Sequence, residues 1–173
     1  MRKIVAGFAA SVDGYIAGPQ GEYDWILMNP EIDFAEEMKR FGVYLYGRNT
    51  YEIVTKSRIK PVSGALHYVL SNTLTDLEKG YTLINGDIKN QLMALKQEDG
   101  KDIALFGGAL LLASLLDLQL VDEISIAVIP VLLGSGKPMV AALKEKVWLE
   151  YATSKTFRNG TIQLTYKVNY TPA

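Results

Sequence analysis

Three short junctions hold the residue types best suited to binding an anion. They are Gly47-Arg48-Asn49-Thr50, Leu70-Ser71-Asn72 and Phe106-Gly107-Gly108-Ala109, and each follows an apolar segment. Glycine lets a ligand approach the backbone closely, and the start of a helix presents free N–H groups to a negative charge. Arg48 adds a fork of donors that matches phosphate, and Thr50 adds a hydroxyl. The chemistry indicated is the binding of phosphate groups.

Each junction taken alone also has a structural explanation. Gly-Arg-x-Thr is an ordinary helix start, Ser71 and Asn72 are residues that cap helices and form turns, and Gly107-Gly108 suits a tight turn. The dinucleotide fingerprint G-x-G-x-x-G does not occur in the sequence, which argues against a Rossmann domain. The site hypothesis therefore requires that the three junctions meet at one edge of a sheet.

Few side chains are suited to acid–base or nucleophilic catalysis. The sequence has no cysteine and one histidine, which argues against a nucleophile–base triad and a zinc site, and we expect no bound metal. His67 opens an apolar strand segment, so we expect a structural role for it. Asp122 and Glu123 stand at the start of another strand, where consecutive side chains point to opposite faces, and we expect surface or capping roles.

The elements that must position these residues alternate between strand and helix over the first two thirds of the chain. Apolar segments bounded by turn residues predict strands over 4–10, 43–46, 67–70, 81–84 and 103–106. Apolar residues three and four apart predict helices over 30–41, 49–56, 88–97 and 109–118. Such alternation is typical of a parallel sheet with helices on its faces. The long segment 11–30 is expected to be a functional loop.

The last third of the chain changes character. Residues 123–133 form a further strand segment interrupted by Pro130, and segments 148–157 and 161–170 flank Asn159-Gly160, a strong hairpin signal. Apolar and polar residues alternate from Ile162 to Tyr170, so we expect one face of this strand to be buried. We therefore predict an α/β fold with three layers, αβα, and a mixed, mostly parallel central sheet that carries an antiparallel C-terminal hairpin.

Composition fits one domain over residues 1–173. The formal net charge is −1 and the chain has no basic run, so nothing favours nucleic acid or an acidic membrane as a partner. The longest apolar stretch, 103–116, is too short to span a bilayer. The N-terminus has the pattern of a secretory signal, but its apolar run is short and Asp13-Gly14 follows it. We expect a buried strand and a cytoplasmic protein, in keeping with the absence of cysteine.

Five blocks, in order over nearly the whole chain, resemble the dihydrofolate reductase fold. The closer resemblance is to the reductase domain that forms the C-terminal half of the bacterial bifunctional riboflavin deaminase-reductase, and to its stand-alone relatives. The blocks lie at residues 10–17 (ASVDGYIA), 46–52 (YGRNTYE), 70–72 (LSN), 106–108 (FGG) and 120–136 (from LVDE to IPVLLGSG).

The resemblance implies an NADPH site and hydride transfer to a small pteridine- or pyrimidine-like heterocycle. The reaction would be like that of 5-amino-6-(5-phosphoribosylamino)uracil reductase or dihydrofolate reductase. By similarity Arg48, Ser71 and Asn72 would face the adenosine 2′-phosphate, and Thr50 and the Gly-Gly turn would face the pyrophosphate. Residues around Ala9, Ala10 and Ile16 would line the nicotinamide pocket. The expected cofactor-binding residues are Ala9, Ala10, Ile16, Gly47, Arg48, Thr50, Leu70, Ser71, Asn72, Phe106, Gly107, Gly108 and Ala109.

The resemblance also supplies candidates for the substrate side of the site. Tyr15 and Trp25 are expected to contact substrate, and Asp13 and Asp33 are the candidate catalytic residues. A carboxylate near the place of Asp33 binds the pterin edge in dihydrofolate reductases, yet Asp33 also suits the first turn of a helix. Asp13 equally suits the Ser-Val-Asp-Gly turn in which it stands. In this fold the Gly-Gly peptide bond is often cis.

Two departures from the riboflavin-pathway reductases bear on the substrate. Those enzymes typically have a lysine within the first strand and another after the Asp-Gly pair, where this chain has Gly7 and Tyr15. A substrate carrying a phosphate would want such cations, so the departures leave the phosphorylated substrate in question. The alternative hypothesis is a nucleotide-binding or assembly module that kept the fold without turnover.

A homodimer is the expected assembly. The segment 109–118 is apolar nearly all round and is predicted to be deeply buried, whereas the C-terminal strands leave an apolar region of sheet that needs cover. In the riboflavin-pathway relatives this part of the fold forms the dimer contact.

Overall fold

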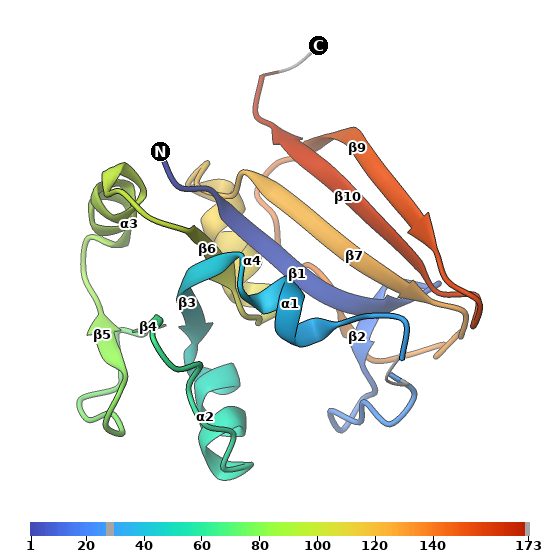
Figure 1. Cartoon of the computed structure of the whole chain (residues 1–173), viewed down its shortest axis with the longest axis horizontal. Helices are drawn as coiled ribbons and strands as arrows, with labels where there is room; N and C mark the ends of the chain where they lie inside the picture. The colour runs from blue at the N-terminus through green and yellow to red at the C-terminus, as the bar shows by residue number, and fades with distance from the viewer. Residues whose placement is uncertain (27–29, 172–173) are drawn as a thin grey trace.

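An eight-stranded sheet in the order β5-β4-β3-β6-β1-β7-β10-β9 forms the centre of the molecule (Figure 1). The computed structural model describes residues 1–26 and 30–171. The strands of this sheet are β1 (Ile4–Ser11), β3 (Phe41–Gly47), β4 (Leu66–Leu70), β5 (Thr82–Ile84), β6 (Asp102–Leu105), β7 (Glu123–Ile129), β9 (Trp148–Thr156) and β10 (Ile162–Asn169). The helices are α1 (Phe34–Met38), α2 (Arg48–Lys56), α3 (Ile88–Gln97) and α4 (Ala109–Asp117). A separate pair joins β2 (Tyr15–Ala17) to β8 (Lys137–Pro138).

The sheet is mixed and mostly parallel, as the sequence predicted. All pairings from β5 through to β7 are parallel, whereas β10 runs antiparallel to both β7 and β9. The parallel strands therefore bring their carboxyl ends to one edge, where the three junctions identified above follow β3, β4 and β6.

Helices cover both faces of the parallel part of the sheet. Leu112, Leu115 and Leu116 of α4 share one buried cluster with residues of α3 and with Ile4 and Ala6 of β1. On the opposite face, side chains of α2 and α1 pack against strands β3, β4 and β6; they are Tyr51, Val54 and Met38. Figure 1 shows α1 in front of β1 and α4 behind the sheet. The predicted three-layer arrangement is confirmed.

The first helix is much shorter than the predicted range 30–41. Asp33 ends the preceding segment by capping the helix, since its Oδ1 accepts a hydrogen bond from the Glu36 N–H at 3.0 Å. At the other end, Phe41 and Gly42 begin β3 instead of closing the helix. The predicted strand 123–133 likewise ends early, at Ile129, because Pro130 has no N–H to donate to a neighbouring strand.

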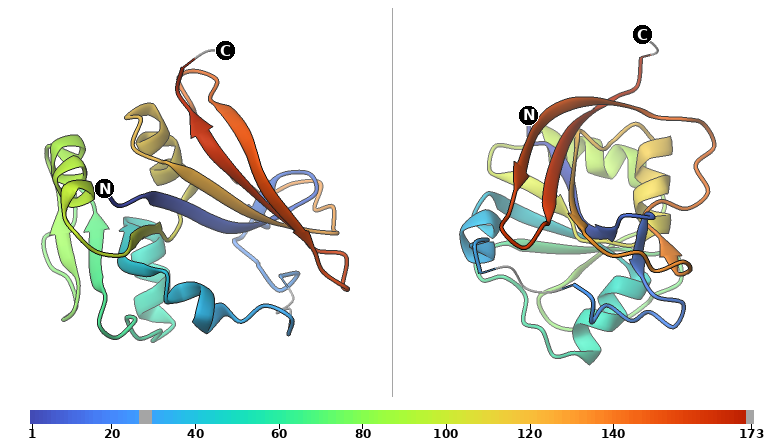
Figure 2. Two further views of the ribbon diagram at one scale, coloured as in Figure 1. Left: turned by 45° about the horizontal axis from the view of Figure 1, so that its top comes forward. Right: turned by 90° about the vertical axis from the view of Figure 1, so that its right-hand side faces the viewer.

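The C-terminal hairpin is far more exposed than the sequence predicted. No residue of β10 is buried, and every residue of β9 is exposed. The alternating pattern of β10 therefore does not give it a buried face within this chain. Figure 2 shows why: β9 and β10 extend past the helices that cover the rest of the sheet. Four large apolar side chains of the hairpin are open to solvent, namely Trp148, Leu149, Tyr151 and Ile162.

Helix α4 is also buried on one side only. Its buried residues are Leu112, Ala113, Leu115 and Leu116, whereas Leu110 is 65% exposed. Within the part of the chain that the structure describes, no helix is long and apolar enough to cross a membrane.

Candidate functional site

Two helix N-termini lie open at the carboxyl edge of the sheet. The cap residues of α2 and α4 are Gly47 and Gly108, and neither helix start has a hydrogen bond from a capping side chain. Helices α1 and α3 differ, because Asp33 and Asp87 cap them through their carboxylates. The first-turn N–H groups of α2 and α4 are thus available to an external acceptor, and the helix dipoles favour an anion there.

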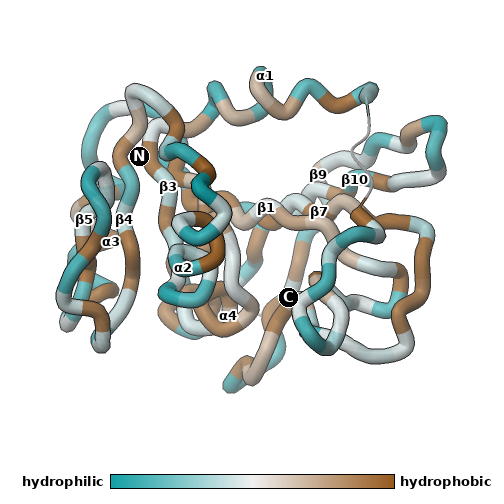
Figure 3. The backbone as a smooth tube through the Cα atoms, turned by 90° about the horizontal axis from the view of Figure 1, so that it is seen from below, coloured by the Kyte–Doolittle hydropathy of each residue, from teal (hydrophilic) through white to brown (hydrophobic). Residues whose placement is uncertain are grey.

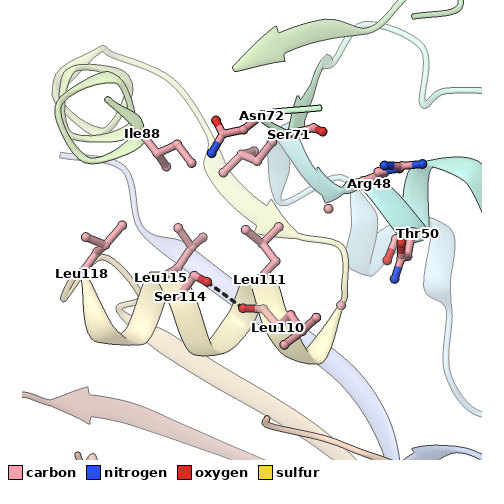
Figure 4. A pocket seen from close by; sticks show the side chains of 14 residues that line it. Arg48, Thr50, Ser71, Asn72, Ile88, Leu110, Leu111, Ser114, Leu115 and Leu118 are labelled. Carbon is pink, nitrogen blue, oxygen red and sulfur yellow. Dashed lines mark hydrogen bonds between the residues drawn. The ribbon is translucent and has the colours of Figure 1, made fainter. Parts of the chain in front are cut away.

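One cavity of about 300 Å³ brings the three junctions together (Figure 4). Its polar side is lined by residues of all three junctions, namely Gly47, Arg48, Asn49, Thr50, Leu70, Ser71, Asn72 and Gly108. Its apolar side is formed by Ile88 together with residues of α4, namely Leu110, Leu111, Leu115 and Leu118. An apolar wall beside two helix N-termini and a guanidinium suits a ligand that has a flat ring at one end and phosphates at the other.

Arg48 is held in place by two partners that sequence reasoning missed. Its Nε donates to Glu52 Oε1 at 2.8 Å, and its Nη1 donates to Thr73 Oγ1 at 3.0 Å. The hydrogen bond and charge of Arg48 lower the pKa of the Glu52 carboxyl, so this group stays ionised. The spacing of Arg48 and Glu52, four residues apart on one helix, was the available signal. Thr73 gave no such signal, because only the fold brings it to α2.

Ser71 and Asn72 line the cavity and also shape the turn after β4. The Ser71 hydroxyl accepts hydrogen bonds from the Thr73 N–H at 3.2 Å and the Leu74 N–H at 3.1 Å. Asn72 Oδ1 accepts one from the Gly86 N–H at 3.3 Å. Ser71 and Asn72 are thus turn-forming residues, as their structural explanation predicted, and they also form part of the cavity wall.

Gly107 and Gly108 adopt a backbone conformation that other residues avoid. Their φ angles are 94° and 91°. A Cβ on Gly107 would lie 3.3 Å from Thr50 Oγ1, so the turn after β6 passes tightly against the start of α2. The peptide bond between the two glycines is trans, contrary to the expectation of a cis bond.

A second, smaller cavity of about 20 Å³ lies beside this turn. It is apolar and is lined by Ala6, Phe8, Ile16, Leu105, Gly107, Gly108, Ala109, Leu112 and Met139. Ile16 and Ala109 line this cavity, and their contact with a cofactor stays a prediction. Ala10 is instead buried in the core, and Ala9 lies on the opposite face of β1. Phe106 also points to that face, where its ring packs against Tyr44 and Tyr46.

The four residues expected on the substrate side line neither cavity. Asp13 accepts hydrogen bonds from the Leu133 N–H at 3.1 Å and the Gly134 N–H at 2.7 Å, which joins the loop after β1 to the loop after β7. The Ser11 hydroxyl and these amides lower the pKa of the Asp13 carboxyl. Asp13 therefore acts as a clamp between loops.

The other three expected substrate-side residues also have structural partners. Asp33 caps α1 and is exposed. Tyr15 lies in β2, in register with Pro138, and the Trp25 Nε1 donates to the Glu22 carbonyl at 3.3 Å. Residues 27–29 of the predicted loop 11–30 lie outside the described residues.

The remaining titratable residues singled out in the sequence have structural roles. His67 stacks on Tyr44 with ring centroids 5.1 Å apart, and its Nδ1 lies 3.0 Å from the Tyr46 hydroxyl. Asp122 accepts from the Ile4 N–H at 2.7 Å and pairs with Lys96 at 2.7 Å. Among the described residues, no group of three or more histidine, cysteine, aspartate or glutamate side chains is placed to hold a metal ion.

The family model of the RibD C-terminal domain matches residues 2–163. This chain belongs to that family. Among curated proteins, the uncharacterized protein YyaP of Bacillus subtilis (strain 168) is 33% identical over 180 residues, which cover 97% of this chain and 96% of YyaP.

Two solved structures show the same fold. A putative riboflavin biosynthesis protein from Shewanella sp. PV-4 has a TM-score of 0.86 at 27% identity, over 96% of this chain and 99% of that chain. Dihydrofolate reductase from Enterococcus faecalis, complexed with NADP(H), has a TM-score of 0.71 at 17% identity, over 96% of each chain. The predicted dihydrofolate reductase-like fold is confirmed.

Proposed function

We propose that this protein binds NADPH in the larger cavity and reduces a small pteridine- or pyrimidine-like heterocycle. The observation that carries the proposal is the meeting of two uncapped helix N-termini, Gly47 and Gly108, with the Arg48 guanidinium at one cavity. The reductases among the family's structural relatives support the same reaction class, and one of them is complexed with NADP(H).

The residues present fit such a dinucleotide. Arg48 has five N–H donors, two of which go to Glu52 and Thr73, so three remain for a 2′-phosphate. The N–H groups that begin α2 and α4 suit the pyrophosphate, with the Thr50 hydroxyl beside them. The apolar residues of α4 would cover the adenine ring. The small apolar cavity at Ile16 and Ala109 would receive the edge of the nicotinamide.

Bound NADPH would supply a hydride, that is, two electrons with one hydrogen nucleus. The reaction also consumes one proton: the acceptor, NADPH and H⁺ are converted to the reduced acceptor and NADP⁺. We assign that proton to water, because Asp13 is engaged in a loop clamp and Asp33 in a helix cap. The chain's own contribution is to bind both partners and to align them.

The first test is direct. Purified protein is titrated with NADPH while the fluorescence of the dihydronicotinamide is followed, and NADPH oxidation is then measured with pterins, pyrimidines and quinones. Absence of NADPH binding would refute the proposal. Binding without oxidation of NADPH by any compound would instead favour the alternative, a nucleotide-binding module without turnover.

We also propose a homodimer formed through the C-terminal hairpin. Leu149 and Tyr151 of β9 are 40% and 60% exposed and stand in register with Val168 and Tyr166 of β10. The apolar residues of β10 are only partly covered within the chain. A second copy packed on this surface would bury the face that the alternating pattern of β10 encodes.

A further inference from the structure

A chain of four polar side chains joins the first turns of α2 to the turn after β4. Helix α2 lies beside β3 and β4 (Figure 3). Hydrogen-bond contacts of 2.8, 3.0 and 3.3 Å link, in this order, Glu52, Arg48, Thr73 and Ser71. We call these four residues the rim cluster, because two of them, Arg48 and Ser71, also line the larger cavity.

The hydroxyl group of Ser71 has no lone pair left for a further donor. A serine oxygen accepts two hydrogen bonds and donates one. The Ser71 oxygen accepts from the Thr73 N–H at 3.2 Å and from the Leu74 N–H at 3.1 Å, and the residue is buried. In the contact between the two hydroxyl groups, Ser71 must therefore be the donor and Thr73 the acceptor.

The hydroxyl group of Thr73 keeps one free donor. Its oxygen accepts from Arg48 Nη1 at 3.0 Å and, by the same count, from Ser71 Oγ at 3.3 Å. Both lone pairs are then used, and the hydroxyl proton is the one hydrogen-bonding group of this side chain that remains. Thr73 is exposed, so the proton is accessible to a ligand that lies against Arg48.

The positive charge of Arg48 is partly balanced before any ligand binds. Arg48 and Glu52 form an ion pair at 2.8 Å, and among the described residues that line the larger cavity Arg48 is the one cation. A phosphate group therefore gains little from net charge at a distance. Its recognition depends on short hydrogen bonds to charged and neutral donors at the site itself.

The Asn72 side chain lies on the other side of the same turn. It extends toward Ile88 at the start of α3 (Figure 4), and its Oδ1 accepts a hydrogen bond from the Gly86 N–H at 3.3 Å. The donors that lie together on the side of α2 are the remaining N–H groups of Arg48 and the hydroxyl proton of Thr73.

We infer that the Thr73 hydroxyl is a ligand of the 2′-phosphate and that, with Arg48, it distinguishes NADPH from NADH. The inference deepens the proposed function and rests on it for the place of the cofactor. Ser71 is a positioning residue, because its proton occupies the Thr73 oxygen and leaves the Thr73 hydroxyl to donate outward. Glu52 holds the opposite side of the guanidinium.

The first experiment is fluorescence titration of the full chain with NADPH and NADH. Thr73→Val removes the hydroxyl at nearly constant shape and should raise the Kd of NADPH about tenfold, while the Kd of NADH changes less than about twofold. Thr73→Ser keeps the hydroxyl and should bind both nucleotides as the wild type does. Thr75→Val is the matched control, because Thr75 is also exposed and its hydroxyl donates to Asp76 at 3.1 Å; it should change neither Kd.

The same substitution in an Arg48→Ala background separates a phosphate ligand from a support of Arg48. If the Thr73 hydroxyl contacts the phosphate, Thr73→Val should still raise the Kd of NADPH about threefold when the guanidinium is absent. If Thr73 acted only by holding Arg48, the substitution would have no effect in that background. That second result would overturn the assignment of Thr73 as a ligand.

Ser71→Ala tests which of the two hydroxyls the phosphate meets. The variant leaves the N–H groups of Thr73 and Leu74 without their acceptor, so it should lower stability in chemical denaturation. It should reduce the preference for NADPH over NADH less than Thr73→Val does, and the reverse order would refute the inference. A wild type that binds NADPH with a preference that Thr73→Val leaves unchanged would overturn the inference alone. A wild type that binds neither nucleotide would overturn the proposed function and the inference with it.

Discussion

Replacement of Arg48 by alanine tests the cofactor assignment most directly. Arg48 is the one guanidinium among the described residues that line the larger cavity, and Glu52 and Thr73 fix its direction. NADPH and NADH differ only in the 2′-phosphate. The variant should therefore weaken binding of NADPH and leave binding of NADH nearly as it was.

The size of the effect follows from exposure. A hydrogen bond to a charged group contributes about 1.5–3 kcal/mol. The Arg48 side chain is 51% exposed, so solvent screens part of the attraction and the lower end applies. A loss of about 1.5–2 kcal/mol corresponds to a rise of about 10- to 30-fold in the Kd of NADPH.

The assay is fluorescence titration with NADPH and NADH at two salt concentrations. Lys56→Ala is the matched control, because it removes one positive charge from the last turn of the same helix, away from the cavity. It should alter the Kd of NADPH less than about twofold, and added salt should narrow the gap between wild type and Arg48→Ala. An equal loss for both nucleotides, or no loss for either, would refute the 2′-phosphate assignment.

Three further outcomes are expected. Asp13→Asn should speed amide exchange in the loop after β7. The pKa of Asp13 in the folded protein lies below its ordinary value of 3.8. The difference in exchange rate between variant and wild type should therefore be complete above pH 3.8 and vanish as the pH falls through the pKa of the folded protein. Gly107→Ala should cost about 1–2 kcal/mol of stability in chemical denaturation, because its φ is 94°, whereas Gly7→Ala should cost little. Tyr151→Lys should convert a dimer to a monomer in light scattering; a wild-type monomer would contradict the assembly.

Much of the fold was predictable because local pattern and tertiary environment agree. The parallel strands at the centre of the sheet are mostly buried and appear in the sequence as apolar runs, and Asn159-Gly160 marks the hairpin. The pattern failed for α1, because the Asp33 carboxylate caps the helix three residues after Pro30 and because Phe41 and Gly42 join β3.

The candidate site was predictable at residues whose chemistry suits phosphate binding wherever the fold places them. Arg48 and the Gly-Gly turn were recognised, and the structure brings both junctions to one cavity. Thr73 was missed, since only the fold brings the turn after β4 to Arg48 of α2. Ala9 and Ala10 were expected in the nicotinamide pocket, but the pleat of β1 turns Ala9 to the opposite face, and Ala10, although on the face of Ala6 and Phe8, is buried in the core.

The bare start of α2 implies that this protein is less stable without its ligand than its fold allows. Gly47 has φ −77° and ψ 160°, a conformation open to any residue, and a Cβ there would make only an ordinary contact with Leu111 at 3.5 Å. Aspartate at this position would cap the helix and add about 0.5–2 kcal/mol, yet its carboxylate would repel a pyrophosphate. A glycine at the start of α2 thus lowers the stability of the empty protein, and under the proposed function it would raise the affinity for a dinucleotide, whose phosphates would take the place of the missing cap.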